Sequence, residues 1–358
     1  RDREYVPNWE LGVWGQTAAR WEKEGLDPDR MHWDWFKGEE YFDMDYREFV
    51  DIKGGMMPSF PEKVIEENER HCIYRDNKGR IRKALKEGET RGTRMSMDQY
   101  LDFPVKNQKD FNNLKERYPV LIEKRYPQNW KEKIAEWNNR DHVLIAGKNC
   151  SFNGFYWNAR EWMGTENLSL AWYDQPELVK DMMKFFADFV ISVLGPIVKK
   201  VNFDYFNFNE DMAMKSGPLL APSTYRKFIF PEIKRVINFL KDNGVKYIAV
   251  DTDGNSEKLI PLLMEAGVDI VWPLERAADM DPVKLRKKYG QDLLLWGGVD
   301  KRVLAQSKQD IKKHLQELAP LVEEGGYIPT VDHTVQPGVP LENFKYYLKL
   351  KKKILGKD

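Results

Sequence analysis

The residues Tyr247-Ile248-Ala249-Val250-Asp251-Thr252-Asp253-Gly254 form an apolar run that ends in carboxylates, and this pattern decides the fold. A short apolar run bounded by turn residues is typical of a buried strand. The pattern recurs along the second half of the chain, and an amphipathic helical stretch separates most neighbouring runs. This alternation predicts βαβ units and a parallel sheet. The predicted strands are 142–146, 205–209, 247–251, 270–274, 293–297 and 327–330.

The intervals between these strands read as helices, several of which open with a proline or a capping residue. Six or more strand–helix units occur, and no Gly-x-Gly-x-x-Gly follows any of the strands. This combination favours an α/β fold of the (β/α)8 TIM-barrel type over a dinucleotide-binding sheet. The predicted helices are 175–200, 222–243, 256–266, 281–289 and 308–324.

The first 140 residues are less regular, and no Pro- or Ser-rich linker separates them from the rest. We therefore expect one domain, 1–358, in which 1–140 is an N-terminal elaboration with the first barrel strand and 141–358 carries the regular repeats. The elaboration contains a predicted β-hairpin over 72–85, with its turn at Asp76-Asn77-Lys78-Gly79. Helices are expected over 8–23 and 62–69. The lysine-rich stretch 349–357 is expected to be a solvated helix end.

Composition excludes several classes of protein. The chain has 358 residues, with 57 basic and 57 acidic side chains, so the net charge of zero argues against a nucleic-acid partner. Its two cysteines include no Cys-x-x-Cys pair and suit a reducing, cytoplasmic setting. The longest apolar stretch, 189–198, is too short to span a membrane. Aromatic residues make up 13%, which fits a large core, a flat organic ligand, or both.

Carboxylates gather where the predicted strands end. In a barrel these positions share one rim, which is where active sites form. Glu210, Asp251, Asp253 and Glu275 are such residues, and His333 follows the last clear strand. Like charges at one rim need a cation, a proton or a basic group to compensate them. Helix caps and ion pairs are the alternative explanation for each residue. Together Asp251, Asp253 and His333 offer two carboxylates and an imidazole, a ligand set that suits a divalent metal.

The segment from Asn207 to the C-terminus resembles the uroporphyrinogen decarboxylase (URO-D) superfamily. The resemblance implies a single TIM-like barrel, and it leaves a homodimer as the expected assembly because such barrels often pair through their faces. The matching stretches are Glu210-Asp211-Met212, Asp251-Thr252-Asp253-Gly254-Asn255, Trp296-Gly297-Gly298-Val299-Asp300-Lys301-Arg302 and Pro337–Asn343.

One branch of the superfamily comprises the true uroporphyrinogen decarboxylases, which need no cofactor. They carry a basic Arg-Gln-Ala-Gly-Arg-Tyr motif that holds a polycarboxylate substrate. This sequence lacks the motif and has a tryptophan-rich front section that includes Trp33 and Trp35. A pocket without those arginines is a poor match for many carboxylates. The resemblance does align the family's catalytic aspartate with Asp51, in Val50-Asp51-Ile52.

The other branch comprises zinc methyltransferases of corrinoid-dependent systems. They bind zinc through a His-x-Cys-Gly motif and a later cysteine. In this sequence Asp251 and Asp253 stand at the first motif, and His333 takes the place of the later cysteine. Thiolate ligands suit activation of a thiol acceptor, whereas an oxygen-rich set suits an oxygen-bearing methyl donor.

The first hypothesis is therefore a metal-dependent methyltransferase of the O-demethylase type. It would move a methyl group from a small methoxylated aromatic, or a similar donor, to the cobalamin of a corrinoid protein. Zn²⁺ held by Asp251, Asp253 and His333 would polarise the donor oxygen. Glu210 would be a fourth ligand or a proton donor, and Asp51 a further catalytic candidate. The candidate substrate-binding residues are Trp33, Trp35, Tyr156, Trp157, Trp272 and Glu275, although core packing explains each aromatic equally well.

Two alternatives remain open. A cofactor-free decarboxylase of a small carboxylated substrate would use a rim aspartate to stabilise the protonated intermediate, and it would release carbon dioxide without a metal. A non-catalytic binder on the same barrel would be stabilised by its ligand without turnover.

Overall fold

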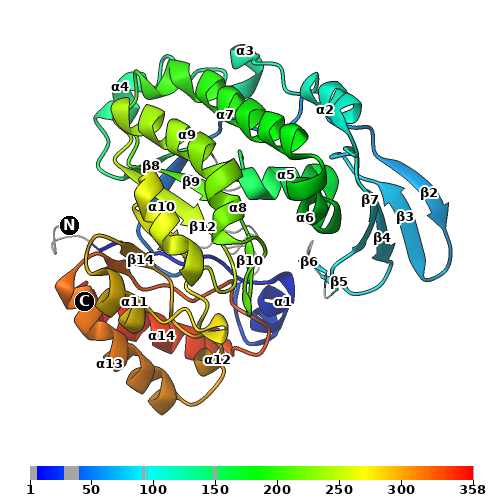
Figure 1. The fold of residues 1–358 in the computed structure, drawn as a ribbon. Helices are drawn as coiled ribbons and strands as arrows, with labels where there is room; N and C mark the ends of the chain where they lie inside the picture. The colour runs from blue at the N-terminus through cyan, green and yellow to red at the C-terminus, as the bar shows by residue number, and fades with distance from the viewer. Residues whose placement is uncertain (1–5, 28–39, 91–92, 95, 148–150, 358) are drawn as a thin grey trace.

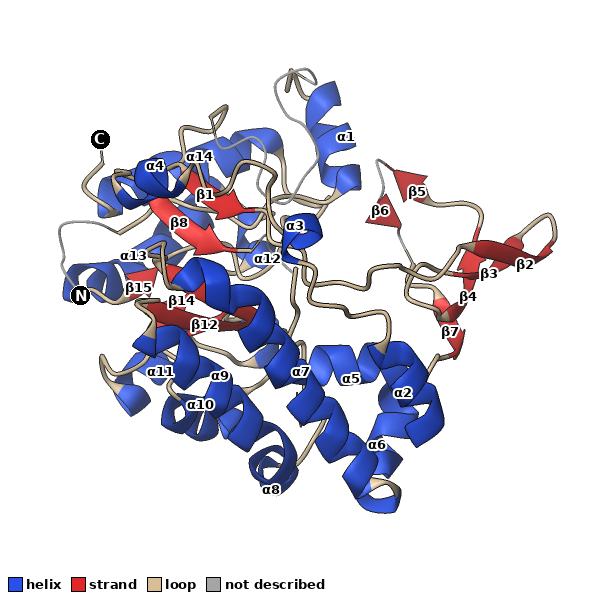
Figure 2. Cartoon of the chain, turned by 90° about the horizontal axis from the view of Figure 1, so that it is seen from above, coloured by secondary structure: helices blue, strands red, loops and turns tan. Residues whose placement is uncertain are grey.

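The computed structural model describes residues 6–27, 40–90, 93–94, 96–147 and 151–357. Seven parallel strands curve around the centre of the molecule, and helices lie outside them (Figure 1, Figure 2). This architecture confirms the predicted α/β TIM-type barrel. In sheet order the strands are β1 (Arg47–Val50), β8 (Val143–Ala146), β9 (Tyr205–Asn209), β12 (Tyr247–Asp251), β13 (Ile270–Trp272), β14 (Leu294–Trp296) and β15 (Tyr327–Ile328).

The predicted helical repeats are confirmed, and the helix α13 begins and ends at the expected residues, Lys308 and Glu324. The helices of the repeats are α7 (Pro176–Val198), α8 (Pro222–Thr224), the π-helical turn η1 (Tyr225–Ile229), α9 (Phe230–Asp242), η2 (Glu257–Leu259), α10 (Ile260–Ala266), η3 (Arg276–Ala278), α11 (Pro282–Tyr289), α12 (Lys301–Leu304), α13 and α14 (Leu341–Ile354). The remaining helices are α1 (Gly15–Lys23), α2 (Gln108–Lys115), α3 (Ile122–Arg125), α4 (Ile134–Asn138), α5 (Phe155–Met163) and α6 (Thr165–Asp174).

The segment 8–13 closes the sheet between β15 and β1. Val13 pairs with Val335 in parallel, and the Val335 amide donates to Gly12 O at 2.9 Å. On the other side, the Arg47 guanidinium donates to Glu10 O at 3.0 Å. The prediction of a helix over 8–23 is therefore wrong for its first half, and α1 begins only at Gly15. The alternation of apolar and other residues from Trp9 to Val13 is a strand period that the helical interpretation missed.

A four-stranded antiparallel sheet stands beside the barrel (Figure 1). Its central hairpin, β3 (His71–Arg75) and β4 (Ile81–Leu85), confirms the predicted one. The stretch 62–69, expected to be helical, instead supplies the edge strand β2 (Lys63–Glu67), because pairing with β3 overrides its helix-favouring glutamates. The other short strands are β7 (Gln99–Asp102), β5 (Glu89–Thr90), β6 (Thr93–Arg94), β10 (Ala213–Met214) and β11 (Gly217–Pro218).

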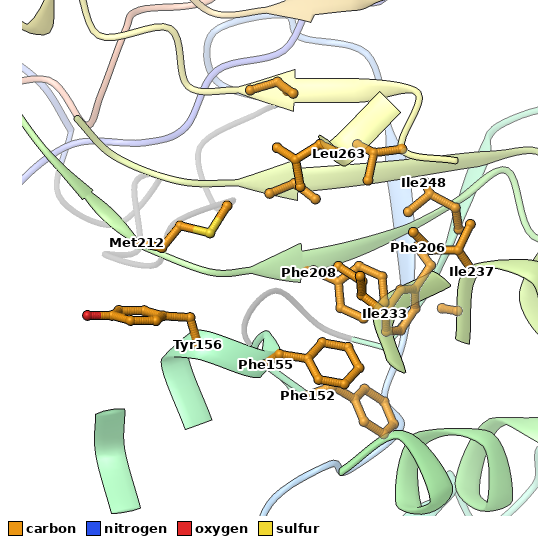
Figure 3. Close-up of a cluster of buried hydrophobic side chains, with 14 of the residues drawn as sticks. Phe152, Phe155, Tyr156, Phe206, Phe208, Met212, Ile233, Ile237, Ile248 and Leu263 are labelled. Atoms are coloured by element: carbon orange, nitrogen blue, oxygen red, sulfur yellow. The ribbon is translucent and has the colours of Figure 1, made fainter. Parts of the chain in front are cut away.

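Alternate residues of the barrel strands point to opposite faces of the sheet and so contribute to two separate hydrophobic cores. One set, with Trp272 and Trp296 stacked at 4.4 Å, fills the barrel interior together with Trp9 and Tyr205. The interior is thus packed and is not a pore. The other set faces the helices. Figure 3 shows Phe206 and Phe208 of β9 near Phe152 and Phe155 on one side and near Ile233 and Ile237 of α9 on the other.

A buried ion pair ties the closing segment to the last helix. Lys351 of α14 has no exposed surface, and its Nζ lies 2.6 Å from Glu10 Oε1. The Tyr347 hydroxyl donates to the same carboxylate, and the Val331 amide donates to its other oxygen at 2.9 Å. The expectation that the lysine-rich end is fully solvated is therefore wrong at Lys351, although Lys349 and Lys353 are exposed. Within the described ranges, no helix is long and apolar enough to cross a membrane.

Replacing Lys351 by methionine should lower the free energy of unfolding by about 3 kcal/mol or more, because the Glu10 charge would stay buried without its partner. The matched change Lys353→Met, two residues along the same helix on an exposed side chain, should shift it by no more than about 0.5 kcal/mol. Urea denaturation of the two variants measures both values. Equal effects would show that the buried pair does not hold the barrel closed.

Candidate active site at the carboxyl ends of the strands

A chain of hydrogen bonds runs through the barrel interior to Asp251, the last residue of β12. The indole N–H of Trp272 donates to Asn207 Oδ1 at 2.8 Å, and the Asn207 amide donates to Asn209 Oδ1 at 2.9 Å. The Asn209 amide then donates to Asp251 Oδ2. These bonds fix the Asp251 carboxyl group at the end of the strand, where barrel active sites form.

The electrostatics of Asp251 are unusual. Burial, followed by the charges of Asp253 and Asp211, raises the pKa of Asp251 well above its usual range, and the hydrogen bond from Asn209 opposes this only in part. A carboxyl group in such surroundings either keeps its proton near neutral pH or needs a cation beside it.

Asp253 and His333 form a contact between the ends of two different strands. His333 Nε2 lies 3.3 Å from Asp253 Oδ2, and Thr334 Oγ1 lies 2.8 Å from His333 Nδ1. Burial lowers the pKa of His333, but the hydrogen bond and the charge of Asp253 outweigh it, so the net shift is upward. The side chains of His333 and Asp253 are 26% and 40% exposed, which leaves the pair accessible to a ligand.

Glu275, Lys301 and Asp332 form a second polar group on this rim. Lys301 Nζ lies 2.9 Å from Glu275 Oε1, and the Gly254 amide donates to Glu275 Oε2 at 2.9 Å. Asp332 is fully buried and accepts hydrogen bonds from the amides of Lys301 and Arg276. Burial raises the pKa of Asp332 to about 6. The sequence places Asp332 beside His333 after the last clear strand, but sequence reasoning assigned it no role in the site.

Glu210 directly follows β9 and is fully buried against the first turn of α5. Its oxygens accept from the amides of Phe155 at 2.9 Å and Tyr156 at 2.7 Å. Burial nevertheless raises the pKa of Glu210 to about 7. Gly154 makes room for this contact, because a Cβ there would lie 2.2 Å from Glu210 Cδ. The carboxylate thus caps α5, and its role as a metal ligand or proton donor stays a prediction.

An ion pair that sequence reasoning missed lies beside Glu210. Arg160 Nη2 lies 2.7 Å from Asp211 Oδ2, and the guanidinium sits 4.9 Å from the centre of the Trp157 ring. Asp211 adopts a positive φ of 41°, which is uncommon for a residue with a side chain. The partners are 51 residues apart, so no sequence spacing indicates the pair.

The remaining predicted residues fall in three places. Asp51 follows β1 at the same rim and is half-buried. Trp272 is buried inside the barrel, and Tyr156 is buried beside Glu210. Trp33 and Trp35 lie outside the described residues. The catalytic role of Asp51 and the substrate-binding roles of the aromatic residues stay predictions.

The donor set Asp251, Asp253 and His333 suits a divalent cation in its chemistry. Its arrangement is less suited, because Asp251 is bonded to Asn209 while Asp253 contacts His333. Among the residues that the structure describes, no group of three histidine, cysteine or acidic side chains is placed to hold a metal ion. Zinc binding therefore stays a prediction.

Comparisons with known proteins agree with the fold. Residues 158–354, more than half of the chain, match the family model described as Uroporphyrinogen decarboxylase (URO-D). The chain is 27% identical to uroporphyrinogen decarboxylase 2 of Oryza sativa over 135 residues, which are 38% of this chain and 34% of the rice protein. It is 25% identical to the decarboxylase of Prochlorococcus marinus over 188 residues, 49% and 52% of the two chains. The chain thus matches about a third to a half of the length of these relatives.

The barrel is also similar to a solved structure described as a methyltransferase from Methanosarcina mazei. The TM-score is 0.59 at 14% identity, and the match covers 97% of this chain and 94% of the other. At this identity the likeness shows the fold alone.

Replacing Gly154 by alanine should lower the free energy of unfolding by about 2 kcal/mol, because the new methyl group displaces Glu210 from the first turn of α5. The control Gly55→Ala lies in a rim loop with nothing within 4 Å of the added Cβ, and its effect should stay within about 0.5 kcal/mol. Chemical denaturation gives both values.

Removing the Glu210 side chain tests whether its collision with the added methyl group causes the loss of stability. In a Glu210→Ala background the Gly154→Ala change should cost much less than in the parent, since the colliding carboxylate is gone. Additive losses would contradict the contact between these two residues.

Proposed function

Because this chain belongs to the uroporphyrinogen decarboxylase family, we propose that it is a methyltransferase that acts at the carboxyl-end rim of the barrel. Its donor would be a small methoxylated aromatic or a similar methyl compound, and its acceptor the cobalt of a corrinoid protein. The observation that carries the proposal is the rim itself, where Asp251 lies at the end of the interior hydrogen-bond chain and Asp253 and His333 form an accessible pair. The name of the Methanosarcina mazei structure supports the reaction class by analogy of fold.

In the proposed reaction the methyl carbon leaves the donor oxygen, and the electron pair of the broken bond stays on that oxygen. The methyl group goes to the reduced corrinoid of the partner, which supplies the attacking electron pair. When His333 is not a metal ligand, the His333–Asp253 pair would give a proton to the leaving oxygen. Asp251, held by Asn209, would orient the donor beside that pair.

The second candidate is a decarboxylase, which the names of the curated relatives favour. Those enzymes act on a substrate with several carboxylates, which need basic partners. Two basic side chains at this rim are already paired, Lys301 with Glu275 at 2.9 Å and Arg160 with Asp211 at 2.7 Å. This pairing supports methyl transfer over decarboxylation of a polycarboxylate.

The proposal predicts that the purified protein converts reduced cobalamin to methylcobalamin when given 2-methoxyphenol, followed by the change in the visible spectrum. Asp251→Asn should slow this conversion by about 100-fold or more, in the range expected for loss of a positioned carboxyl group. The control Asp141→Asn changes a fully exposed carboxylate just before β8, at the opposite end of the barrel, and should leave the rate unchanged. A rate equal to the parent's in Asp251→Asn would place the chemistry elsewhere.

Zinc binding is tested separately. Protein purified without chelator should contain about one zinc per chain if Asp251, Asp253 and His333 are ligands. His333→Ala should lose the metal and keep the circular dichroism of the parent. A parent that takes up no zinc when the ion is added contradicts the predicted metal site without contradicting the proposed rim.

A further inference from the structure

Tyr156 carries a buried hydroxyl group without a hydrogen-bond partner among the described residues. The residue is 1% exposed, and within the part of the chain that the structure describes its hydroxyl oxygen has no hydrogen-bond partner. A buried polar group without a partner is rare in folded proteins and calls for an explanation. A bound molecule that accepts this hydrogen bond is one such explanation.

The position of Tyr156 favours a ligand over a structural partner. It is the second residue of α5, and its backbone amide is fixed on Glu210 Oε2 at 2.7 Å. Its neighbour Phe155 packs into the core against Phe186 and Phe208. Figure 3 shows the Tyr156 ring pointing the other way, out of the phenylalanine cluster and toward the side where the strands end. The hydroxyl therefore lies toward the rim that carries Asp251.

The surroundings determine what the hydroxyl can bind. Burial raises the pKa of Tyr156 to about 12, and the charges of Asp211 and Glu210 add to this while Arg160 opposes it. The hydroxyl is thus neutral at physiological pH and keeps a proton that it can donate to an acceptor. Arg160 already neutralises Asp211, so the ion pair beside Tyr156 offers no spare positive charge to an anion. An uncharged oxygen is the acceptor that fits.

We propose that the Tyr156 hydroxyl donates a hydrogen bond to an uncharged ether or hydroxyl oxygen of an aromatic substrate, and so selects oxygen-bearing rings. This inference rests on the proposed function, since it concerns the same rim. Trp157, the next residue along α5, is half-buried, and the Arg160 guanidinium lies 4.9 Å from its ring centre and 6.0 Å from that of Tyr156, so both aromatic rings lie near the same cation. Tyr156 is then a substrate-binding residue that recognises the substrate oxygen through a hydrogen bond.

A second tyrosine provides a matched control. Tyr225 in η1 is also fully buried, its hydroxyl likewise lacks a partner among the described residues, and the charge of Glu210 acts on it as well. Both tyrosines belong to the same hydrophobic cluster, but Tyr225 comes from the helix layer, ahead of α9, and not from α5. Tyr225→Phe therefore removes the same atom as Tyr156→Phe from a similar environment, without changing the α5 hydroxyl.

The experiment compares two probes of similar size, methoxybenzene and ethylbenzene, by isothermal titration calorimetry. They differ in one oxygen, so the ratio of their dissociation constants isolates the contact to that oxygen. The parent and Tyr225→Phe should share one ratio. In Tyr156→Phe the preference for methoxybenzene should fall about fivefold, the value of a typical neutral hydrogen bond. Both variants should unfold at a temperature no lower than the parent, because neither hydroxyl has a partner to lose among the residues that the structure describes.

Three results would overturn the inference, and they have different meanings. An unchanged ratio in Tyr156→Phe removes the hydrogen bond and leaves the proposed function standing. A loss of thermal stability confined to Tyr156→Phe shows that the hydroxyl has a structural partner instead. If the parent binds neither probe, the proposed function loses its aromatic substrate, and the inference about Tyr156 fails as well.

Discussion

The ion pair between Glu10 and Lys351 is the contact on which the barrel depends. It joins the segment that closes the sheet to the last helix, and the same carboxylate receives hydrogen bonds from Tyr347 and from the amide of Val331 beside β15. A buried charge of this kind is tolerated only while its partners stay in place. The ends of β9 and β12 lie together because these strands pair directly in parallel, and His333, which follows β15, meets Asp253 at the same rim. The position of His333 therefore depends on how the last strand and the closing segment meet.

Several carboxylates lie close together at the rim, and different groups of the protein compensate their negative charges. Lys301 pairs with Glu275, and Arg160 pairs with Asp211. The amides of α5 donate hydrogen bonds to Glu210. Among the described residues, the Asp251 carboxyl group accepts a side-chain hydrogen bond only from Asn209, and its pKa stays strongly raised. The rest of the protein thus compensates the charges of Asp251 and of the accessible Asp253–His333 pair less than those of the other rim groups. Such groups are where a substrate, a proton or a cation gains the most from binding.

The sequence predicted the repeating part of the fold well, because strand and helix periods are local. The strands 205–209 and 247–251 and the helix 308–324 have the predicted bounds, and the rim carboxylates follow from them. The failures are long-range. The closing segment 8–13 meets its partner Val335 only in the folded barrel, and the ion-pair partner of the buried Lys351 lies 341 residues away. Likewise Arg160 meets Asp211 only after α5 docks beside β9, so neither the pair nor the unpartnered Tyr156 hydroxyl could be predicted from spacing.

Methyl transfer at the carboxyl-end rim is tested most directly by the fate of labelled atoms. The protein is given 4-methoxybenzoate with ¹³C in the methyl group and ¹⁴C in the carboxyl group, together with reduced cobalamin. We predict that ¹³C appears in methylcobalamin and that no ¹⁴C appears as carbon dioxide. Release of ¹⁴C-labelled carbon dioxide with no labelled methylcobalamin would contradict the methyltransferase and establish the decarboxylase in its place.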